Sequence, residues 1–308
     1  MTSSSAAVRA GVIPSRAGNA DDLCPRRRRF GSLITSLWAL YLLTFRQHLH
    51  GRRWMVLGLL LLLPALLTVV IRLLAPDAPR SVTELWMVFM FIPQVLLPLV
   101  ALVYAAGIIT DEQEEQTLTY LLIRPIPRWA IYVTKMATVM TTTGLLTIVF
   151  TAVTFVAVHV GGDLGLSDGL ARFARVAGLH VLAVVAYGSL FGLISLLTRR
   201  SLVASVIYAV VFEGLLANLE FNIRYLTVIY YTRLLACRLI EFEPVQVRGQ
   251  TTNIAAQLWQ LGTNANLPQH PTVVQATLVL GLVALVSTIL GAILVARREF
   301  HVKTPEGV

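Results

Sequence analysis

The chain has 308 residues, of which 56% are hydrophobic and only 13% are charged, and its mean hydropathy is +0.73. Soluble domains carry about 45–50% apolar and about 25% charged residues, so this composition excludes a soluble globule. The net charge of +9 would suit nucleic-acid binding only if the basic residues gathered on one soluble face. They bracket apolar segments instead, which is typical of a membrane protein, and we expect no nucleic-acid partner.

The N-terminal 50 residues predict two elements before the first spanning helix. Residues 1–29 are rich in Ser, Ala and Arg, and we expect a disordered, basic cytoplasmic tail there. Residues 30–50 place apolar side chains at three- and four-residue steps between basic flanks. This pattern predicts an amphipathic interfacial helix in the cytoplasmic leaflet. The alternative, a seventh spanning helix, is disfavoured because the apolar run is short.

Six segments reach the roughly 20 apolar residues that a helix needs to cross a bilayer. They lie at residues 54–74, 85–109, 129–158, 173–197, 202–219 and 273–296. We therefore predict an all-α, polytopic membrane domain over residues 51–298, with a cytoplasmic C-terminal tail at 299–308.

The distribution of basic residues predicts the orientation of these helices. With both termini in the cytoplasm, 17 of the 25 Lys and Arg lie on the inner side, as the positive-inside rule requires. Arg172 and Arg175 then fall at the outer interface, where we expect them to extend toward lipid headgroups. The long segment 220–272 is external and too charged to span. Its apolar stretches 226–240 and 254–261 predict short helices that lie at the outer interface or dip into the membrane where protein shields them.

Residues 110–124 predict a short cytoplasmic helix between the second and third spanning helices. Thr110 and Gln113 form a capping box, and the acidic residues that follow suit the positive end of a helix dipole. Leucines then give one apolar face, until Pro125 and Pro127 end the helix. Such a helix can pass motion from a soluble partner into the membrane. A merely solvated acidic loop is the alternative.

This region resembles the type-2 ABC (ATP-binding-cassette) export permeases, in which an acidic run is followed by Thr-Leu, two leucines, a proline, an arginine and a lysine. In this chain Lys135 holds the lysine position. The residues that the resemblance assigns to coupling with the ATPase are Glu112, Glu114, Glu115, Thr117, Leu118, Leu121, Leu122, Pro125 and Arg128.

The resemblance implies a permease subunit of the bacterial inner membrane, present as two copies, with a homodimer favoured, and joined to two ABC ATPase subunits. It also implies that ATP and Mg belong to those partner chains. The sequence contains no GxxxxGK[ST] phosphate-binding loop, so we expect no nucleotide site, no catalytic residues and no cofactor in this chain.

Three polar residues at membrane depth are candidates for the transport pathway or its gate: Glu213, Thr141 and Thr142. A carboxylate in the membrane costs at least about 2.5 kcal/mol, so Glu213 must face a cavity or a partner, with His180 or Arg175 as possible structural partners. The threonines of 138–143 and the glycines Gly188 and Gly192 more often serve close helix packing.

Two other classes of function remain open at this point. A secondary transporter driven by protons or sodium would carry intramembrane acids in paired repeats, of which the sequence shows one acid and no clear repeat. An intramembrane enzyme would need a nucleophile and a base, or paired acids, at membrane depth. We expect no metal site, because the histidines have no second ligand at helical spacing, and we expect Cys24 and Cys237 to be unpaired thiols.

Overall fold

The computed structural model of the protein describes residues 25–108, 127–162, 165–198, 200–218, 222–242, 245–247, 250–252, 255, 258–259 and 270–297. The predicted N-terminal tail lies outside this part except for its last five residues, and the predicted C-terminal tail lies wholly outside it.

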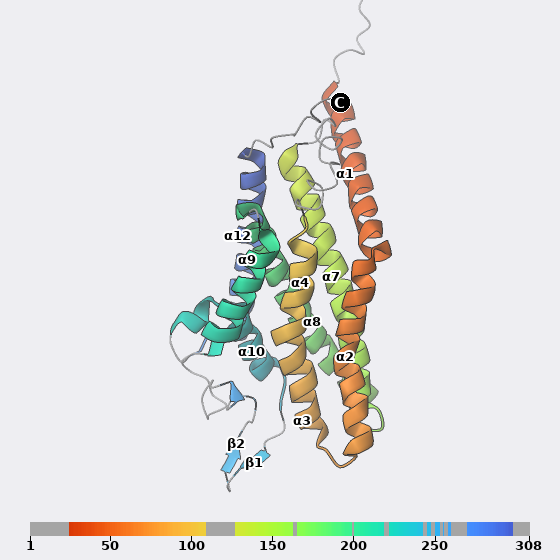
Figure 1. Cartoon of the computed structure of the whole chain (residues 1–308), viewed down its shortest axis with the longest axis vertical. Helices are drawn as coiled ribbons and strands as arrows, with labels where there is room; N and C mark the ends of the chain where they lie inside the picture. The colour runs from red at the N-terminus through yellow and green to blue at the C-terminus, as the bar shows by residue number, and fades with distance from the viewer. Residues whose placement is uncertain are drawn as a thin grey trace, which may run out of the picture.

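The described residues form a helical bundle, with one short hairpin of two strands (Figure 1). In chain order the α-helices are α1 (Pro25–His50), α2 (Arg52–Leu74), α3 (Arg80–Glu84), α4 (Leu97–Ala105), α7 (Arg128–His159), α8 (Leu166–Leu197), α9 (Ser201–Tyr208), α10 (Val228–Leu239) and α12 (Val273–Arg297). The other elements are the π-helical segments η2 (Leu85–Leu96) and η3 (Ala209–Leu215), the 3₁₀ turns η4 (Leu216–Asn218) and η5 (Asn222–Leu226), and the strands β1 (Val245–Val247) and β2 (Gln250–Thr252).

Six helices in the described part of the chain are long and apolar enough to cross a membrane, namely Arg53–Leu74, Arg80–Ala105, Arg128–His159, Leu166–Leu197, Ser201–Asn218 and Val273–Arg297. The prediction of an all-α, polytopic membrane protein is confirmed. The second and fourth spans begin earlier than predicted, at Arg80 and Leu166. Both extensions carry charged residues, such as Glu84 and Arg172, and therefore do not belong to the apolar runs.

The helices run along one common direction, so the bundle has two ends (Figure 1). The start of α1, the start of α7 and the end of α12 lie at the upper end in that view. The turn between α2 and α3, the end of α7 and the hairpin lie at the lower end. The two described termini are therefore on the same side of the bundle, as an even number of spans requires.

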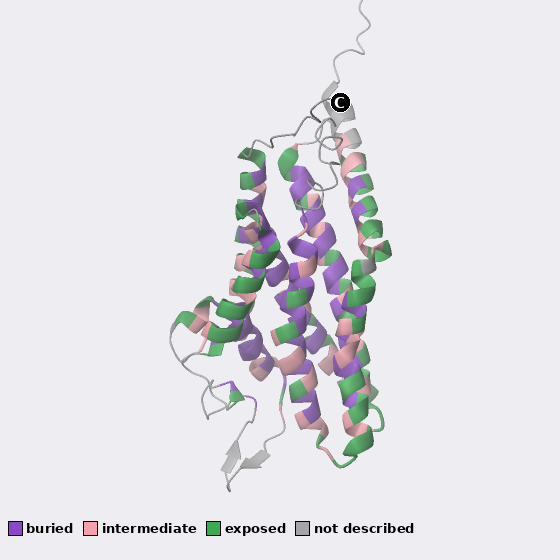
Figure 2. Cartoon of the chain, in the orientation of Figure 1, coloured by how far each residue is buried: buried purple, intermediate pink, exposed green. Residues whose placement is uncertain are grey.

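The fourth span, α8, lies at the centre of the bundle, where it packs against α4, α7 and α12. In its apolar stretch 67% of residues are buried, compared with 22% for Ser201–Asn218 and 28% for α12. Figure 2 shows the same contrast between purple inner and green outer helices. The outer helices expose apolar faces that are unfavourable in contact with water. Lipid or another protein must therefore cover them.

The second span changes its winding along its length. It begins as α3, continues as the π-helical η2 with Pro93 inside it, and returns to an α-helix in α4, where Pro98 occupies the first turn. Proline removes a backbone donor, and π-helical winding leaves a wider, less regular turn. The lower part of this span is therefore joined to the upper part through an irregular segment.

The helix α1 packs along α7 rather than away from the bundle, and it stands end to end with α2 (Figure 1). One face of α1 is turned toward α7, where His48 lies 3.3 Å from the Thr142 hydroxyl and Leu40 and Thr44 are buried. Its other face exposes large apolar side chains, including Ile34 and Trp38. Because α1 runs along the bundle in line with α2 (Figure 1), its placement in the membrane interface stays a prediction.

Part of the predicted external segment enters the bundle. The helix α10 packs against α8, α12 and η2, and its residues from Val228 to Ala236 are buried. Of the two predicted placements for 226–240, the structure therefore has the one in which protein shields the helix. Farther along, β1 and β2 pair antiparallel, with Gln246 opposite Thr251.

Candidate functional site

Glu213 is a buried carboxylate inside the fifth span, where it accepts four hydrogen bonds. Its Oε1 and Oε2 accept the backbone N–H groups of Val228 (3.0 Å) and Ile229 (2.9 Å), respectively. The Tyr187 hydroxyl, from α8, donates to Oε2 at 2.9 Å, and the Tyr208 hydroxyl donates to Oε1 at 3.5 Å. Glu213 therefore connects α8, the fifth span and the start of α10.

The Glu213 carboxylate acts as the N-cap of α10. The first N–H groups of a helix have no partner within it, and a carboxylate placed there also meets the positive end of the helix dipole. Thr227 precedes α10, but its hydroxyl donates to the carbonyl of Arg224 at 2.7 Å instead of capping the helix. Because the cap comes from another helix, it fixes α10 against η3.

The fifth span is irregular around Glu213. The helix widens to π-helical winding over Ala209–Leu215 and then tightens to a 3₁₀ turn at Leu216–Asn218. The stretch contains no proline. The irregular winding is therefore not caused by the missing backbone N–H of a proline. Short π-helical stretches occur frequently at functional sites. The change of winding lies where the span contacts α8 and α10.

Arg233 adds a positive charge on α10 near this carboxylate. Its side chain is buried, and its Nη1 donates to the Asn218 Oδ1 at 3.0 Å. Burial lowers the pKa of Arg233, and the nearby Tyr187 and Glu213 oppose that shift by favouring the charged form. Polar and ionisable groups from three elements thus converge around Glu213.

The predicted partners of Glu213 were wrong. The ring of His180 pairs instead with the Thr151 hydroxyl at 3.0 Å, and Arg175 donates to the carbonyl of Leu239 at 3.3 Å. His180 lies about two helical turns before Tyr187 along α8, which places it nearer the lower end. The sequence could not show this, because the position of α10 between the spans was unknown.

The two threonine candidates do not share this site. Thr142 donates to the carbonyl of Thr138 and contacts His48 of α1, whereas Thr141 is exposed and donates to the carbonyl of Ala137. These hydrogen bonds lead to α1 and to α7 itself, whereas those of Glu213 lead to α8 and α10. Thr141 and Thr142 therefore lie on different faces of α7, and neither contacts the carboxylate.

At the upper end, the last turn of the second span is tied to two other spans. The Lys135 Nζ, from α7, donates to the carbonyl of Ile108 at 3.3 Å. The Ser201 hydroxyl, at the start of the fifth span, donates to the carbonyl of Ala106 at 3.1 Å. A cation at the C-terminal end of a helix is favoured by the helix dipole. The residues that enter the predicted coupling segment are thus joined to α7 and α9.

A sequence model of the ABC-2 family transporter proteins matches residues 49–214, which is more than half of the chain. The chain belongs to the ABC-2 transporter family. The matched range includes the first four spans and most of the fifth, ending one residue after Glu213. No curated protein matches the chain.

Membership in the ABC-2 family makes the chain a membrane-spanning permease subunit of an ABC transporter. The predicted resemblance to the type-2 ABC permeases is confirmed. The alternative interpretations, a secondary transporter and an intramembrane enzyme, lose their support. Most of the predicted coupling residues of this ABC-2 subunit fall outside the described residues: Glu112, Glu114, Glu115, Thr117, Leu118, Leu121, Leu122 and Pro125. Arg128 is described and begins α7, with an exposed side chain.

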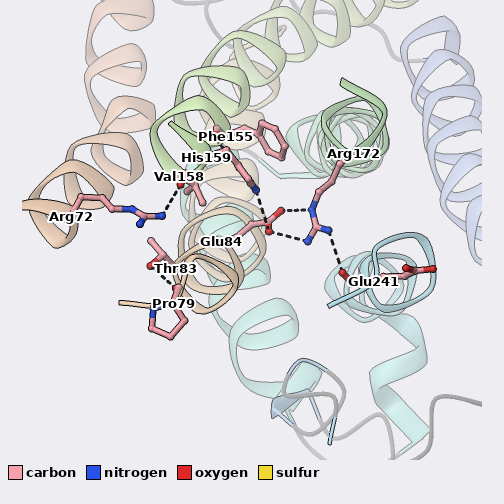
Figure 3. A network of polar contacts seen from close by, with 9 residues as sticks. All are labelled: Arg72, Pro79, Thr83, Glu84, Phe155, Val158, His159, Arg172 and Glu241. Carbon is pink, nitrogen blue, oxygen red and sulfur yellow. Dashed lines mark hydrogen bonds and ion pairs between the residues drawn. The ribbon is translucent and has the colours of Figure 1, made fainter. Parts of the chain in front are cut away.

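At the lower end, this ABC-2 subunit has a charged cluster that sequence reasoning missed. Arg172, from α8, makes two hydrogen bonds of 2.9 Å to the carboxylate of Glu84 (Figure 3). The expectation that Arg172 and Arg175 extend toward headgroups was wrong, because Glu84 and the carbonyls of Leu239 and Glu241 accept their hydrogen bonds. The signal for this cluster was a lone acid just before the apolar run of the second span.

Proposed function

We propose that this chain is the permease subunit of an ATP-driven ABC exporter whose ATPase is a separate polypeptide. The observation that carries the proposal is the family match over the spans on both sides of residues 109–126. These 308 residues contain no phosphate-binding loop, which supports an ATPase on another chain.

The proposed coupling helix at residues 110–124 receives the ATPase at the cytoplasmic face. Its flanks support this role: Ile108, on one side, accepts a hydrogen bond from Lys135, seven residues after Arg128 on the other side. A push on the segment therefore reaches the second and third spans together. Through Ser201 and the carbonyl of Ala106 it also reaches the fifth span, which carries Glu213.

We place the upper end of the bundle in the cytoplasm of a bacterial inner membrane. The basic residues of the upper end support this orientation, because Lys and Arg concentrate on the cytoplasmic side. The arginines of the lower end do not oppose it, since each named here has an acceptor within the protein. Arg72 donates to the carbonyl of Val158 at 2.7 Å, Arg80 donates to that of Gly161, and Arg172 pairs with Glu84.

Two copies of the chain, each with its ATPase, form the proposed transporter. Exposed apolar side chains on the fifth span support a contact between the two copies in the membrane. They are those of Leu202, Val206 and Val210. Glu213, in the same span, is the proposed gate residue. Its carboxylate holds α10 to α8, so a movement of this span changes the position of a helix that lies within the bundle.

Affinity purification of the full chain from its own cells, in mild detergent, tests the proposal. The expected result is a co-purifying soluble protein with a phosphate-binding loop, in a ratio of one to one, and vanadate-sensitive ATP hydrolysis by the complex. A chain that purifies alone, together with unaltered transport after the cells lose every such ATPase encoded beside it, would contradict the proposal.

A further inference from the structure

Glu84 joins the lower ends of several elements through one buried carboxylate (Figure 3). Arg172 binds it with two parallel hydrogen bonds of 2.9 Å, from Nε to Oε1 and from Nη2 to Oε2. His159, at the end of α7, lies 3.7 Å away, and Arg172 also donates to the carbonyl of Glu241 at 3.2 Å. The carboxylate thus lies between α3, α7 and α8, and Arg172 extends the cluster to the residues after α10.

Apart from the Glu84–Arg172 pair and the contact between Thr151 of α7 and His180 of α8, the hydrogen bonds of the lower end fall within two groups of elements. Arg72 of α2 donates to the carbonyl of Val158 in the last turn of α7, and Arg80 of α3 donates to that of Gly161, just after α7. These contacts tie α2 and α3 to the end of α7. Arg175 of α8 donates to the carbonyl of Leu239, which ties α8 to α10. The Glu84–Arg172 ion pair is a charged contact between the first group and the second.

The chemistry of this contact suits a junction that opens to water. A buried ion pair adds little to stability, because removing both charges from water costs about as much as their attraction returns. Glu84 is only 3% exposed in its side chain and Arg172 is 23% exposed, so the pair carries that cost here. Once separated and hydrated, however, both groups are well solvated, whereas a separated apolar contact would expose hydrocarbon. An ion pair can therefore part and re-form with a small change in free energy.

The helix that carries Glu84 can move relative to the rest of its span. The π-helical η2 begins at Leu85, the next residue, and contains Pro93, while Pro98 follows in α4. Helices bend at prolines and at π-helical turns. At its other end the same span reaches Ile108, directly before the proposed coupling helix. One span thus connects the ATPase side with the ion pair through a bendable segment.

We propose that the Glu84–Arg172 ion pair closes the outer mouth of the permease and separates when ATP binding drives the transporter to its outward-open state. The inference rests on the proposed function, because it takes the driving motion from the ATPase. The two groups of elements part at this pair, with η2 as the bend, and the pair re-forms after ATP hydrolysis.

The test measures the distance across the pair in the complete complex with its ATPase, in lipid nanodiscs. Spin labels are attached at Asp77, in the exposed turn between α2 and α3, and at Leu170, on the exposed side of α8, after Cys24→Ser and Cys237→Ala. Pulsed electron paramagnetic resonance then gives the distance distribution without nucleotide and after trapping with ATP and vanadate. The expected result is a shift to longer distances on trapping, and Glu84→Gln shows part of the longer population without nucleotide.

Matched variants separate opening from misfolding. Glu241→Gln removes the charge of a neighbouring acid but keeps the backbone carbonyl that accepts a hydrogen bond from Arg172. This variant is expected to behave as the wild type. The exchange of Glu84→Arg with Arg172→Glu is expected to restore the short distance that Glu84→Gln loses. An unchanged distance in a complex that hydrolyses ATP would make the pair a static brace and overturn this inference alone. Failure to obtain any ATPase complex would instead overturn the proposed function.

Discussion

The carboxylate of Glu213 accepts the backbone N–H of Val228 at 3.0 Å, across 15 residues of chain. This hydrogen bond places the carboxylate of a side chain in η3 at the positive, N-terminal end of α10, so a costly intramembrane charge is stabilised by a helix terminus. It also explains why α10, a short helix with Arg233 and Arg238 in it, can lie against the apolar α8 and α12. The relationship makes the fifth span and α10 one mechanical unit.

Replacing Glu213 tests whether its carboxylate holds the fifth span and α10 together. Glu213→Ala leaves the N–H groups of Val228 and Ile229 and the Tyr187 hydroxyl without their acceptor, and unsatisfied buried groups cost about 1–3 kcal/mol. We expect a lower melting temperature of the detergent-purified protein. Glu213→Gln keeps one acceptor oxygen, so it is expected to insert and bind the ATPase normally while its transport falls. Tyr208→Phe, which removes only the 3.5 Å contact, serves as the control and is expected to melt near the wild type. Wild-type transport by Glu213→Gln would remove Glu213 from the gate.

A close approach between α7 and α12 depends on Gly291. A Cβ at this position would overlap the Tyr132 ring, which is almost fully buried, whereas a Cβ at Gly281 of the same helix would meet open space. Gly291→Ala is therefore expected to destabilise the protein by about 1–3 kcal/mol through overpacking. Gly281→Ala is the matched control and is expected to leave the melting temperature unchanged or slightly raised. Equal melting temperatures for the two variants would show that the helices do not approach as closely as described.

Gly192 confirms the packing interpretation made from the sequence, whereas Gly188 does not. A Cβ on Gly192 would overlap the Met136 side chain and lie 3.3 Å from the Tyr132 hydroxyl. Nothing lies within 4 Å of a Cβ on Gly188. Among the described residues, the GxxxG spacing therefore marks one close contact and not two.

Lys135 gives a test of the link between the coupling segment and the bundle. Lys135→Met keeps the apolar length of the side chain but removes the donor to the Ile108 carbonyl, a charge-assisted contact worth about 1.5–3 kcal/mol. We expect the variant to bind the ATPase but to stimulate its activity less than the wild type. Lys135→Arg retains a donor and is expected to recover most of the stimulation. If Lys135→Met stimulated the ATPase fully, the contact would have no part in coupling.

The coupling segment itself can be tested by charge reversal. Glu114→Lys with Glu115→Lys opposes the helix dipole, and Leu118→Arg places a charge on the proposed apolar face. Each change is expected to separate ATP hydrolysis from transport, measured in parallel in proteoliposomes. Thr119→Ala alters the same segment outside the proposed set and should leave coupling intact. Normal coupling in the charge-reversed protein would count heavily against the proposed mechanism.

The spans could be predicted from the sequence because a run of apolar residues is sufficient to specify a membrane helix. All six appeared where the runs predicted, and the ends that were missed are those with charged residues. Glu84 and Arg172 extend their helices beyond the apolar runs, since each neutralises the other. A hydropathy pattern cannot show such a pair, because the two residues are 88 positions apart.

The site was less predictable than the fold. Glu213 could be selected from its depth alone, but its partners depend on how α10 folds back into the bundle, which the local sequence does not specify. The arginines of the lower end show the same limit. Arg72, Arg175 and Arg238 each donate to a backbone carbonyl of another segment, and only the three-dimensional arrangement creates these contacts.

The most direct test of the central claim is site-specific photo-crosslinking from position 118 in intact membranes, with the adducts identified by mass spectrometry. We expect a photoreactive residue in place of Leu118 to form an adduct with a soluble ATPase that contains a phosphate-binding loop. The proposed coupling would be contradicted if position 118 formed no such adduct and a membrane-impermeant reagent labelled it from outside the cell.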